Sequence, residues 1–459
     1  MSIPDGLAAA LESELGSASL LTGSATAAYA IDGIAPAMVA LPTHIEEVAA
    51  VLRRAGEQQC TIVPRGGGSH IWLGQTPQQV DLVLSMQRLQ QQLAYEPADM
   101  TTTVQAGICM LTLQQMLARS GQRVALDPPL TPTTTLGGLV AANRSGPRRL
   151  LYGTARDVLL GMTVVTLDGK CTKSGGRVVK NVTGYDVTKL YIGSLGTLAV
   201  LAELTVKLHP LPPGEVTIGV ECAHGADLLP VLQMLLQLPL RLNSLELLNS
   251  TACVAVRMDT DVAMADSAYM VLARMEGLPT VLQSQERRVR EALRRMALRR
   301  APAVYTWSPA EQERLWQGVG ALLRGERVTQ QVAETMLMQV SLRMSDLPAF
   351  CQTVEDTARQ FACPCAVVAH AGNGIVYVHL PVAAPTASES ARLLECLQAI
   401  DACVARLGGR RVLERAPVMV KQQCQVWGAT GDDFPLMRAI KTAYDPHGRL
   451  NPGRFIGGL

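Results

Sequence analysis

Residues 62–74 read IVPRGGGSHIWLG, so three consecutive glycines follow an arginine directly after a strand-like run. Glycine costs backbone entropy, and a run of it indicates positive φ angles or a close approach to the main chain. Successive amide groups at the end of a strand can form a concave nest that binds an anion such as a pyrophosphate. Arg65 could add charge there and Ser69 a hydroxyl donor. The stretch therefore favours a dinucleotide site over its main alternative, a plain surface turn.

Two common phosphate-binding motifs do not fit these glycines. Counted from Gly66, a G-x-G-x-x-G fingerprint needs a glycine at position 71, where Ile71 stands, and no acidic residue follows at the ribose-binding distance. A P-loop needs Gly-Lys followed by Ser or Thr, a tripeptide that the sequence lacks. A dinucleotide would thus have to bind in some other fold.

A second cluster of small residues, TPTTTLGGLVAANRSGP, occupies positions 131–147. Thr135 offers a hydroxyl, the Gly137–Gly138 pair permits close backbone approach, and residues 143–146 form a second polar turn. Two separate loops of this kind could hold the two ends of a long, flat ligand. FAD has that shape, with a pyrophosphate at one end and an isoalloxazine ring that needs close backbone contact at the other.

Length and composition set the broader class. A chain of 459 residues exceeds one ordinary core, so two domains with a small third piece are expected. The sequence is 48% hydrophobic and 17% charged, which is a globular composition. A net charge of +2 and an aromatic content of 4% argue against nucleic acid as the partner.

The cysteines and the most apolar segments indicate in which cellular compartment the protein is found. Eleven cysteines without a CxxC spacing fit free thiols in a reducing environment better than disulfides or an iron–sulfur site. The first residues carry acids and no basic region, so they do not predict a secretory signal. The apolar stretch 228–248 is interrupted by glutamines, prolines and an arginine, which argues against a transmembrane segment. We therefore expect a cytoplasmic protein.

Periodicity in the first half mixes strands and helices closely, which predicts an α+β or α/β arrangement. Thr43 and Glu46 have capping-box spacing at the start of an amphipathic helix over 43–58. Strands are expected at 61–63, 80–86, 101–107 and 162–165, and a further helix at 111–121.

Pro210 to Gly214 form the clearest domain boundary in the sequence. The second half predicts strands at 215–222, 242–248, 252–258, 332–343 and 374–380, and helices at 226–237, 280–299, 346–360 and 387–406. This order favours a ferredoxin-like β-α-β-β-α-β layout. We expect a lead-in over 1–34, a cofactor-binding domain over 35–213 and a cap domain over 214–459.

At this point the sequence resembles a known family. The stretches 63–70, 131–147, 152–170 and 175–210 are similar to the FAD-binding domain of the vanillyl-alcohol-oxidase-like, or PCMH-type, flavoproteins. The resemblance is closest to the FAD-binding subunits of bacterial glycolate oxidase, especially the smaller E subunit. The tail 436–459 resembles the end of the same family, whereas 215–360 resembles it only weakly. The resemblance implies an α+β fold: a two-subdomain FAD-binding domain followed by a ferredoxin-like cap.

The resemblance also implies which residues contact FAD. The first loop would wrap the pyrophosphate, and the later residues would line the flavin and adenine ends. The residues are Pro64, Arg65, Gly66, Gly67, Gly68, Ser69, His70, Thr135, Gly138, Asn143, Gly146, Thr154, Asp157 and Val206.

Some relatives attach the flavin covalently through a histidine in the first loop. In this chain Ser69 occupies that place and His70 comes one residue later. We expect the one-residue shift to turn the imidazole away, so the sequence predicts non-covalent FAD.

Larger relatives carry a divalent-metal site in the cap, with the motif H-x-G-D-G-N-x-H and a later A-E-H-G. Here His370 keeps the first position, but Asn373 and Tyr377 replace the acid and the second histidine. Glu414 stands at the glutamate position and is followed by Arg415 instead of histidine. A guanidinium repels a divalent cation, so we predict no metal site. Arg415 could instead hold a substrate carboxylate, or be plain structure.

The resulting hypothesis is a FAD-dependent oxidoreductase that oxidises a 2-hydroxy acid such as glycolate or D-lactate. Candidate bases for the hydroxyl proton are His370 and His379, and candidate carboxylate holders are Arg415 and Lys421. As the resemblance implies, electrons would leave to an iron–sulfur subunit or to quinone, next to a larger flavoprotein subunit. Such partners could hold the protein at the inner membrane.

Several alternatives stay open from the sequence. The chain could be a non-catalytic FAD-binding subunit for assembly or electron relay, or an oxidase of a larger alcohol or sugar. Lys180 and Tyr185 could lie near the flavin or belong to a turn, and the tail 445–453 has the spacing of two structural turns. Seven arginines over 286–300 could dock an acidic partner or be a solvated helix face.

Overall fold

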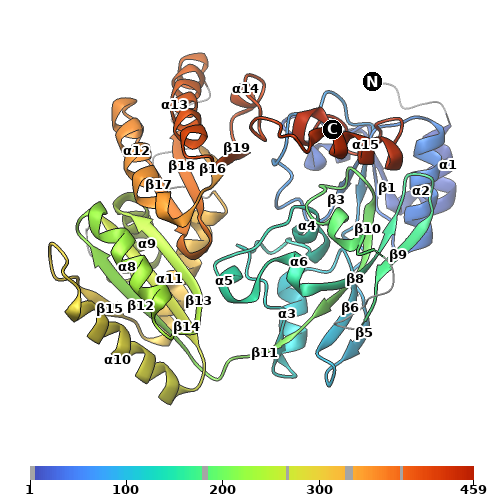
Figure 1. Ribbon diagram of the computed structural model, residues 1–459. Coiled ribbons are helices and arrows are strands. Elements are labelled where there is room, and N and C mark those ends of the chain that lie inside the picture. The colour runs from blue at the N-terminus through green and yellow to red at the C-terminus, as the bar shows by residue number, and fades with distance from the viewer. Residues whose placement is uncertain (1–5, 178–184, 265–267, 326–333, 383–385) are drawn as a thin grey trace.

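The computed structural model describes residues 6–177, 185–264, 268–325, 334–382 and 386–459. Its first half contains two main sheets and a short two-stranded one, and its second half is built around one large sheet, with the short helix α5 (Arg149–Tyr152) between the halves (Figure 1). The predicted α+β class is confirmed.

The first sheet has the strand order β1-β2-β4-β3, in which β4 runs parallel to β2 and β3. Its elements are β1 (Leu20–Thr22), β2 (Met38–Ala40), β3 (Ile62–Arg65) and β4 (Leu82–Ser85), with α1 (Leu7–Leu15) and α2 (Ile45–Glu57) packed against them. The predicted capping box at α2 is wrong in one residue. Both the amide and the hydroxyl of Thr43 donate to Glu47, at 2.6 and 3.1 Å, instead of pairing with Glu46.

The second sheet is antiparallel, in the order β5-β6-β10-β8-β9. Its strands are β5 (Gln92–Glu96), β6 (Thr101–Gln105), β8 (Leu159–Val165), β9 (Cys171–Gly175) and β10 (Val200–Lys207). The accompanying elements are α3 (Met110–Ala118), α4 (Leu136–Ala141), α5 (Arg149–Tyr152), α6 (Ala155–Val158), α7 (Thr188–Tyr191) and the short pair β7 (Gln122–Arg123) and β11 (His209–Pro210). These two sheets form the expected pair of subdomains.

The second half forms an eight-stranded antiparallel sheet in the order β15-β12-β14-β13-β17-β18-β16-β19. Its strands are β12 (Glu215–Cys222), β13 (Leu242–Asn249), β14 (Tyr269–Glu276), β15 (Val304–Thr306), β16 (Glu334–Ser341), β17 (Ala366–His370), β18 (Ile375–Val382) and β19 (Arg410–Arg415). One face packs on α8 (Leu228–Gln237), α10 (Pro279–Arg295), α12 (Leu347–Gln360) and α13 (Ala387–Arg406). The other face is partly covered by α9 (Ser250–Thr260) and α11 (Pro309–Leu323).

The predicted strand at 252–258 is wrong, because this segment lies within the helix α9. The Asn249 side chain accepts from the amide of Ala252 and caps the helix, and Ala252, Cys253 and Val256 share its buried face. That spacing of three and four residues is helical, although the segment is rich in β-branched residues.

The C-terminal segment leaves the large sheet after α14 (Val418–Lys421) and returns to the first half as α15 (Phe434–Tyr444) (Figure 1). Lys441 donates to the carbonyl of Thr197 at 2.8 Å, and the amide of Ile62 donates to the carbonyl of Arg449 at 2.8 Å. The tail is therefore part of the cofactor-binding half in space. The domain limits 1–34, 35–213 and 214–459 stay a prediction.

Candidate FAD site

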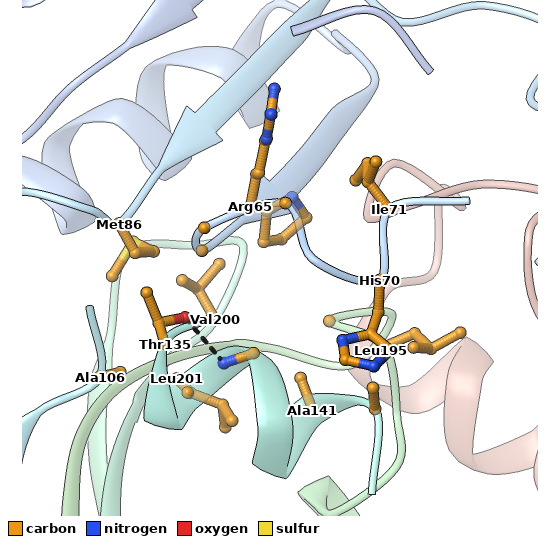
Figure 2. Close-up of a pocket in the computed structure, with 18 of the residues that line it drawn as sticks. Arg65, His70, Ile71, Met86, Ala106, Thr135, Ala141, Leu195, Val200 and Leu201 are labelled. Carbon is orange, nitrogen blue, oxygen red and sulfur yellow. Dashed lines mark hydrogen bonds between the residues drawn. The ribbon is translucent and has the colours of Figure 1, made fainter. Parts of the chain in front are cut away.

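The glycine loop after β3 forms one wall of a pocket that reaches between the two sheets of the first half (Figure 2). The pocket encloses about 790 Å³ of empty space, a figure that includes open solvent at its mouth. Its lining consists of Pro64, Arg65, Gly66, Gly67, Gly68, Ser69, His70, Ile71, Leu73, Met86, Ala106, Thr135, Gly137, Gly138, Ala141, Ala142, Leu195, Gly196, Ala199, Val200, Leu201, Asn451 and Arg454.

The two glycine-rich loops touch each other directly. A Cβ atom on Gly66 would lie 2.1 Å from the Thr135 hydroxyl, and one on Gly67 would lie 1.5 Å from the carbonyl oxygen of Thr133. The two loops therefore do not hold opposite ends of a ligand, as the sequence suggested. They stand side by side and form one continuous wall, which is why neither Gly66 nor Gly67 can carry a side chain.

The amides of this wall are suited to an anion. Within the described residues, the amide groups of Gly66, Gly67, Gly68 and Ser69 donate no hydrogen bond to another part of the chain. Gly68 has a φ of +76°, a left-handed conformation that glycine adopts without strain. Unpaired amides at the end of a strand form an anion nest, so this loop fits a pyrophosphate.

Arg65 was expected to add positive charge to the anion site, but its guanidinium has other partners. Its guanidinium lies 4.6 Å from the centre of the Tyr29 ring and donates to the carbonyl of Ala28 at 3.1 Å. Figure 2 shows the side chain pointing away from Thr135. Arg65 therefore braces the loop against the N-terminal segment.

His70 also differs from the expectation, because its side chain lines the pocket and lies beside Leu195 (Figure 2). The loop turns at residues 69–70, so the one-residue shift does not move the imidazole away. His70 Nδ1 lies 3.0 Å from the Ser69 hydroxyl. Burial, followed by the charge of Arg144, lowers the pKa of His70 to about 3, so the ring is neutral.

The other residues that the resemblance assigned to FAD divide into two groups. Thr135 and Gly138 line the pocket, and the Thr135 hydroxyl accepts from the Gly138 amide at 3.2 Å (Figure 2). The following residues lie outside the lining: Asn143, Gly146, Thr154, Asp157 and Val206.

Local structure accounts for these five positions. Thr154 and Asp157 form the capping box of α6, and a Cβ on Gly146 would lie 1.8 Å from a backbone oxygen. Asn143 is exposed, whereas Val206 is buried in the core of β10. Val200 and Leu201, nearer the start of β10, reach the pocket instead.

The tail supplies two pocket residues that spacing alone had suggested were structural. Arg454 donates to the carbonyls of Ile71 and Leu73 at 2.5 and 2.7 Å, and Asn451 donates to the carbonyl of Leu195 at 2.7 Å. Both also line the pocket. The only signal in the sequence was the resemblance of the tail itself. Of the earlier alternatives, Tyr185 is 96% exposed, and Lys180 lies outside the described residues.

A second polar group lies between the halves of the chain, where α5 contacts β13. His370 Nδ1 lies 2.9 Å from both carboxylate oxygens of Glu246, and both side chains are fully buried. Within the described residues, His370 Nε2 has no hydrogen-bond partner. Burial lowers the pKa of His370 to about 3 and raises that of Glu246 well above its usual value.

Glu414, where the resemblance implied a metal ligand, takes part in an ion pair in this chain. Arg144 Nη1 pairs with Glu414 Oε1, and the Arg144 guanidinium lies 5.8 Å from the centre of the Tyr377 ring. Tyr377 in turn packs edge-on against His370, with 5.3 Å between ring centres. Across the ranges that the structure covers, no three His, Cys, Asp or Glu side chains gather in an arrangement that could hold a metal ion.

Of the four candidate catalytic residues, Lys421 and Arg415 both contact Trp72, whereas His370 and His379 have other partners or none among the described residues. Lys421 Nζ pairs with both oxygens of Asp32, at 3.0 and 2.9 Å, and also donates to the carbonyl of Trp72. Its three donors are used, so it cannot hold a substrate carboxylate. Arg415 lies 5.2 Å from the Trp72 ring. His379 is fully buried in β18 with neither ring nitrogen paired among the described residues, and burial lowers its pKa to about 3.

Comparison with protein families agrees with the pocket. Residues 36–175 match a family described as the FAD binding domain, and residues 211–455 match the C-terminal domain of FAD linked oxidases. The second match covers more than half of the chain. The chain therefore belongs to the FAD-linked oxidases, a family of oxidoreductases, and its cofactor is FAD, as the sequence predicted.

Curated relatives cover nearly the whole chain. A D-2-hydroxyglutarate dehydrogenase of Xanthomonas citri is 29% identical over 439 residues, covering 92% of this chain and 89% of the relative. The glycolate oxidase subunit GlcD of Bacillus subtilis is 25% identical over 426 residues, with the same coverage. A D-lactate dehydrogenase of Archaeoglobus fulgidus is 26% identical over 422 residues, covering 91% of each. The resemblance to the smaller E subunit stays a prediction.

Solved structures confirm the PCMH-type fold. A 4-ethylphenol oxidase from Gulosibacter chungangensis superposes with a TM-score of 0.76 at 16% identity, covering 99% of this chain and 98% of that one. p-Cresol methylhydroxylase superposes with a TM-score of 0.75 at 15% identity, covering 98% and 96%. In the described part of the chain, no helix combines the length and apolarity needed to cross a bilayer.

Proposed function

We propose that the chain is a FAD-dependent dehydrogenase of small 2-hydroxy acids such as glycolate or D-lactate. The observation that carries the proposal is the buried His370, whose Nε2 is unpaired among the described residues and lies within the electrostatic reach of two arginines, Arg144 and Arg149. Arg144 also acts on His70, which lines the FAD pocket. Arg144 lies 5.8 Å from the centre of the Tyr377 ring, and Tyr377 packs against His370, so a proton acceptor and a cation share one cluster.

Each group has a defined part in this proposal. When bound, FAD supplies the acceptor for the two electrons and the C2 hydrogen of the substrate. His370 Nε2 takes the hydroxyl proton, and the product is a 2-oxo acid. Glu246 positions the imidazole by accepting from Nδ1, which leaves a lone pair on Nε2. The pyrophosphate of FAD would be held by the amides of residues 66–69.

The electron acceptor is part of the proposal too. The relatives named as glycolate oxidase subunits support a multi-subunit complex. In this proposal an iron–sulfur subunit or quinone receives the electrons beside a larger flavoprotein subunit. None of the eleven cysteines forms a disulfide, which supports a cytoplasmic location, with such partners holding the protein at the inner membrane.

A second candidate, a non-catalytic FAD-binding subunit, is favoured by one observation. At the positions where the resemblance implies a metal motif, Tyr377 stands in place of a histidine and Glu414 is paired with Arg144. In that case flavin in this chain would only relay electrons or support assembly.

Turnover of the purified chain tests the two candidates. Glycolate and D-lactate are supplied with a dye acceptor, and the visible flavin absorption is followed without dye. Bleaching by substrate alone supports the dehydrogenase, whereas bleaching only after a partner subunit is added supports the relay.

The Glu246→Gln variant tests the role of the His370–Glu246 pair. It should keep its FAD and lower kcat by about 100-fold, the usual scale of general-base catalysis. In the unaltered enzyme the rate should rise with pH as Glu246 ionises, because burial raises its pKa. The variant should lack that rise, and an unchanged pH profile would exclude the assignment.

A further inference from the structure

Among the described residues, Arg149 has no carboxylate partner, whereas Arg144 and Arg148 beside it in the sequence each have one. It lies on α5 and is half-buried. Arg144 pairs with Glu414, and Arg148 pairs with Glu215 and Glu276 at 2.9 and 2.8 Å. Within the described residues, the Arg149 guanidinium makes neither a hydrogen bond nor an ion pair. A partly desolvated guanidinium without a carboxylate partner has its donors available for a ligand anion.

The surroundings of Arg149 place it next to the proposed base. A Cβ atom on Gly372, two residues after His370, would lie 2.7 Å from Leu150 Cδ1, so α5 contacts the turn that follows His370. The charge of Arg149 lowers the pKa of both His370 and Glu246, after burial has lowered the first and raised the second. The two side chains thus share one environment.

Several buried polar atoms in this environment lack partners. Within the described residues they are Arg144 Nε, Ser145 Oγ and His370 Nε2, and their side chains are 6%, 4% and 1% exposed. Buried polar atoms without partners are rare and each costs about 1–3 kcal/mol. Their concentration at one interface indicates a polar ligand that donates and accepts hydrogen bonds there.

We propose that Arg149 binds the carboxylate of the substrate, in place of Arg415 and Lys421. The guanidinium can take a carboxylate with two parallel hydrogen bonds, and this leaves the 2-hydroxyl free for His370 Nε2. Lys421 is used up by Asp32 and Trp72, and Arg415 lies over Trp72. This assignment rests on the proposed function.

The central experiment compares Arg149→Gln and Arg149→Lys with a matched control, Arg294→Gln, an exposed position on α10. FAD content is measured first, so that loss of cofactor is separated from loss of substrate binding. Arg149→Gln should raise KM for D-lactate by about 10- to 100-fold, the scale of a charge-assisted hydrogen bond. The KM of Arg149→Lys should fall between those of the unaltered enzyme and Arg149→Gln, because lysine keeps the charge but loses the two parallel hydrogen bonds.

Two further readouts separate a carboxylate holder from a structural residue. The unaltered enzyme should prefer D-lactate to lactamide, and Arg149→Gln should lose most of that preference. Sodium oxalate should perturb the flavin absorption of the unaltered protein, and the variant should need at least 10-fold more oxalate for the same change.

The outcomes distinguish this assignment from the proposed function. If the unaltered protein oxidises D-lactate and Arg149→Gln matches Arg294→Gln in KM and oxalate affinity, Arg149 is not the carboxylate holder although the function stands. The same holds if Arg415→Gln shows the losses instead. If oxalate binds through Arg149 without any turnover of hydroxy acids, the carboxylate site stands and the dehydrogenase proposal fails.

Discussion

Gly67 shows how strictly single residues define the FAD pocket. A Cβ atom added to Gly67 would lie 1.5 Å from the carbonyl oxygen of Thr133, and this backbone atom cannot rotate away as a side chain could. Position 67 therefore requires glycine because there is no space for a side chain. Position 68 requires glycine because its φ is positive.

Gly67→Ala should separate the two loops and abolish FAD binding, with a loss of more than about 3 kcal/mol of stability from overpacking. Gly320→Ala is the control, because a Cβ on this helical glycine would meet only Arg324 Nη1, at an ordinary 3.6 Å, and its φ is normal. It should stabilise the protein by about 0.5–1 kcal/mol. FAD titration and thermal unfolding measure both, and a Gly67→Ala protein that binds FAD normally would contradict the tight contact.

The position of His70 makes it important to measure whether FAD is bound covalently or non-covalently. Its ring lines the pocket, although Nδ1 is engaged by Ser69. We still expect non-covalent FAD, so acid precipitation should release the flavin into the supernatant. Colour that stays with the pellet in the unaltered protein and is released in His70→Ala would show a covalent bond to His70.

At the scale of elements, the end of β14 joins the two halves of the chain. Glu276 accepts from Arg123 at 2.5 Å, from Arg148 at 2.8 Å and from Tyr152 at 2.7 Å. Burial alone would raise the pKa of Glu276, but hydrogen bonds and charge from the two arginines outweigh it and lower the pKa to about 2. The carboxylate is therefore ionised and holds β7 and α5 against the large sheet.

Glu276→Gln should lower the free energy of unfolding by about 3 kcal/mol, the usual cost of breaking a buried ion pair. Since the folded pKa lies below that of the unfolded chain, this stabilisation is complete above about pH 4.5 and fades as the pH falls toward 2. Urea unfolding at several pH values measures the difference, with the exposed Glu313→Gln as control. A difference that grows on acidification would contradict the assigned ionisation.

The elements also show where prediction from sequence succeeded and where it failed. Strands such as 215–222 and helices such as 387–406 were predictable, because the spacing of their apolar residues matches either the alternation of a strand or the 3.6-residue period of a helix. The strand β14, YMVLARME, was missed because it is buried on both faces and shows no alternation. α9 was misassigned because its β-branched residues favoured a strand, while its cap at Asn249 decided for a helix.

The FAD pocket was largely predictable for a related reason, since its wall is built from two short local motifs. The interface between the halves was not, because its pairs join residues far apart in the chain, such as Arg144 with Glu414 and Glu246 with His370. No local pattern reports such contacts. Arg149 was likewise overlooked, because what distinguishes it is the lack of a partner among the described residues rather than any motif.

At the scale of the whole molecule, Lys421 connects three distant segments. It is fully buried and binds Asp32 of the N-terminal segment and the carbonyl of Trp72 in the loop after the glycines. Nearby, Gln75 donates to the carbonyls of Lys421 and Cys424. The loop that carries His70 is thus fixed from both sides.

Lys421→Met should destabilise the protein by about 3–5 kcal/mol and weaken FAD binding, because Asp32 is left as a buried charge without its partner. The double variant Asp32→Asn, Lys421→Met should recover most of the loss. Asn also tolerates the left-handed conformation of this position, where φ is +49°. Thermal unfolding of the three proteins measures the recovery, and a double variant no better than the single would contradict the charge argument.

The pairing of Ile62 with the C-terminal segment has a consequence for biosynthesis. The amide of Ile62 donates to Arg449 and its carbonyl accepts from Asn451 at 2.7 Å, so the strand that leads into the glycine loop has a neighbour almost four hundred positions downstream. A ribosome exposes that strand long before it has made the neighbour. The nascent chain must leave the free edge of β3 without this neighbour until the tail is made, and the pocket lining is complete only after synthesis has passed Arg454.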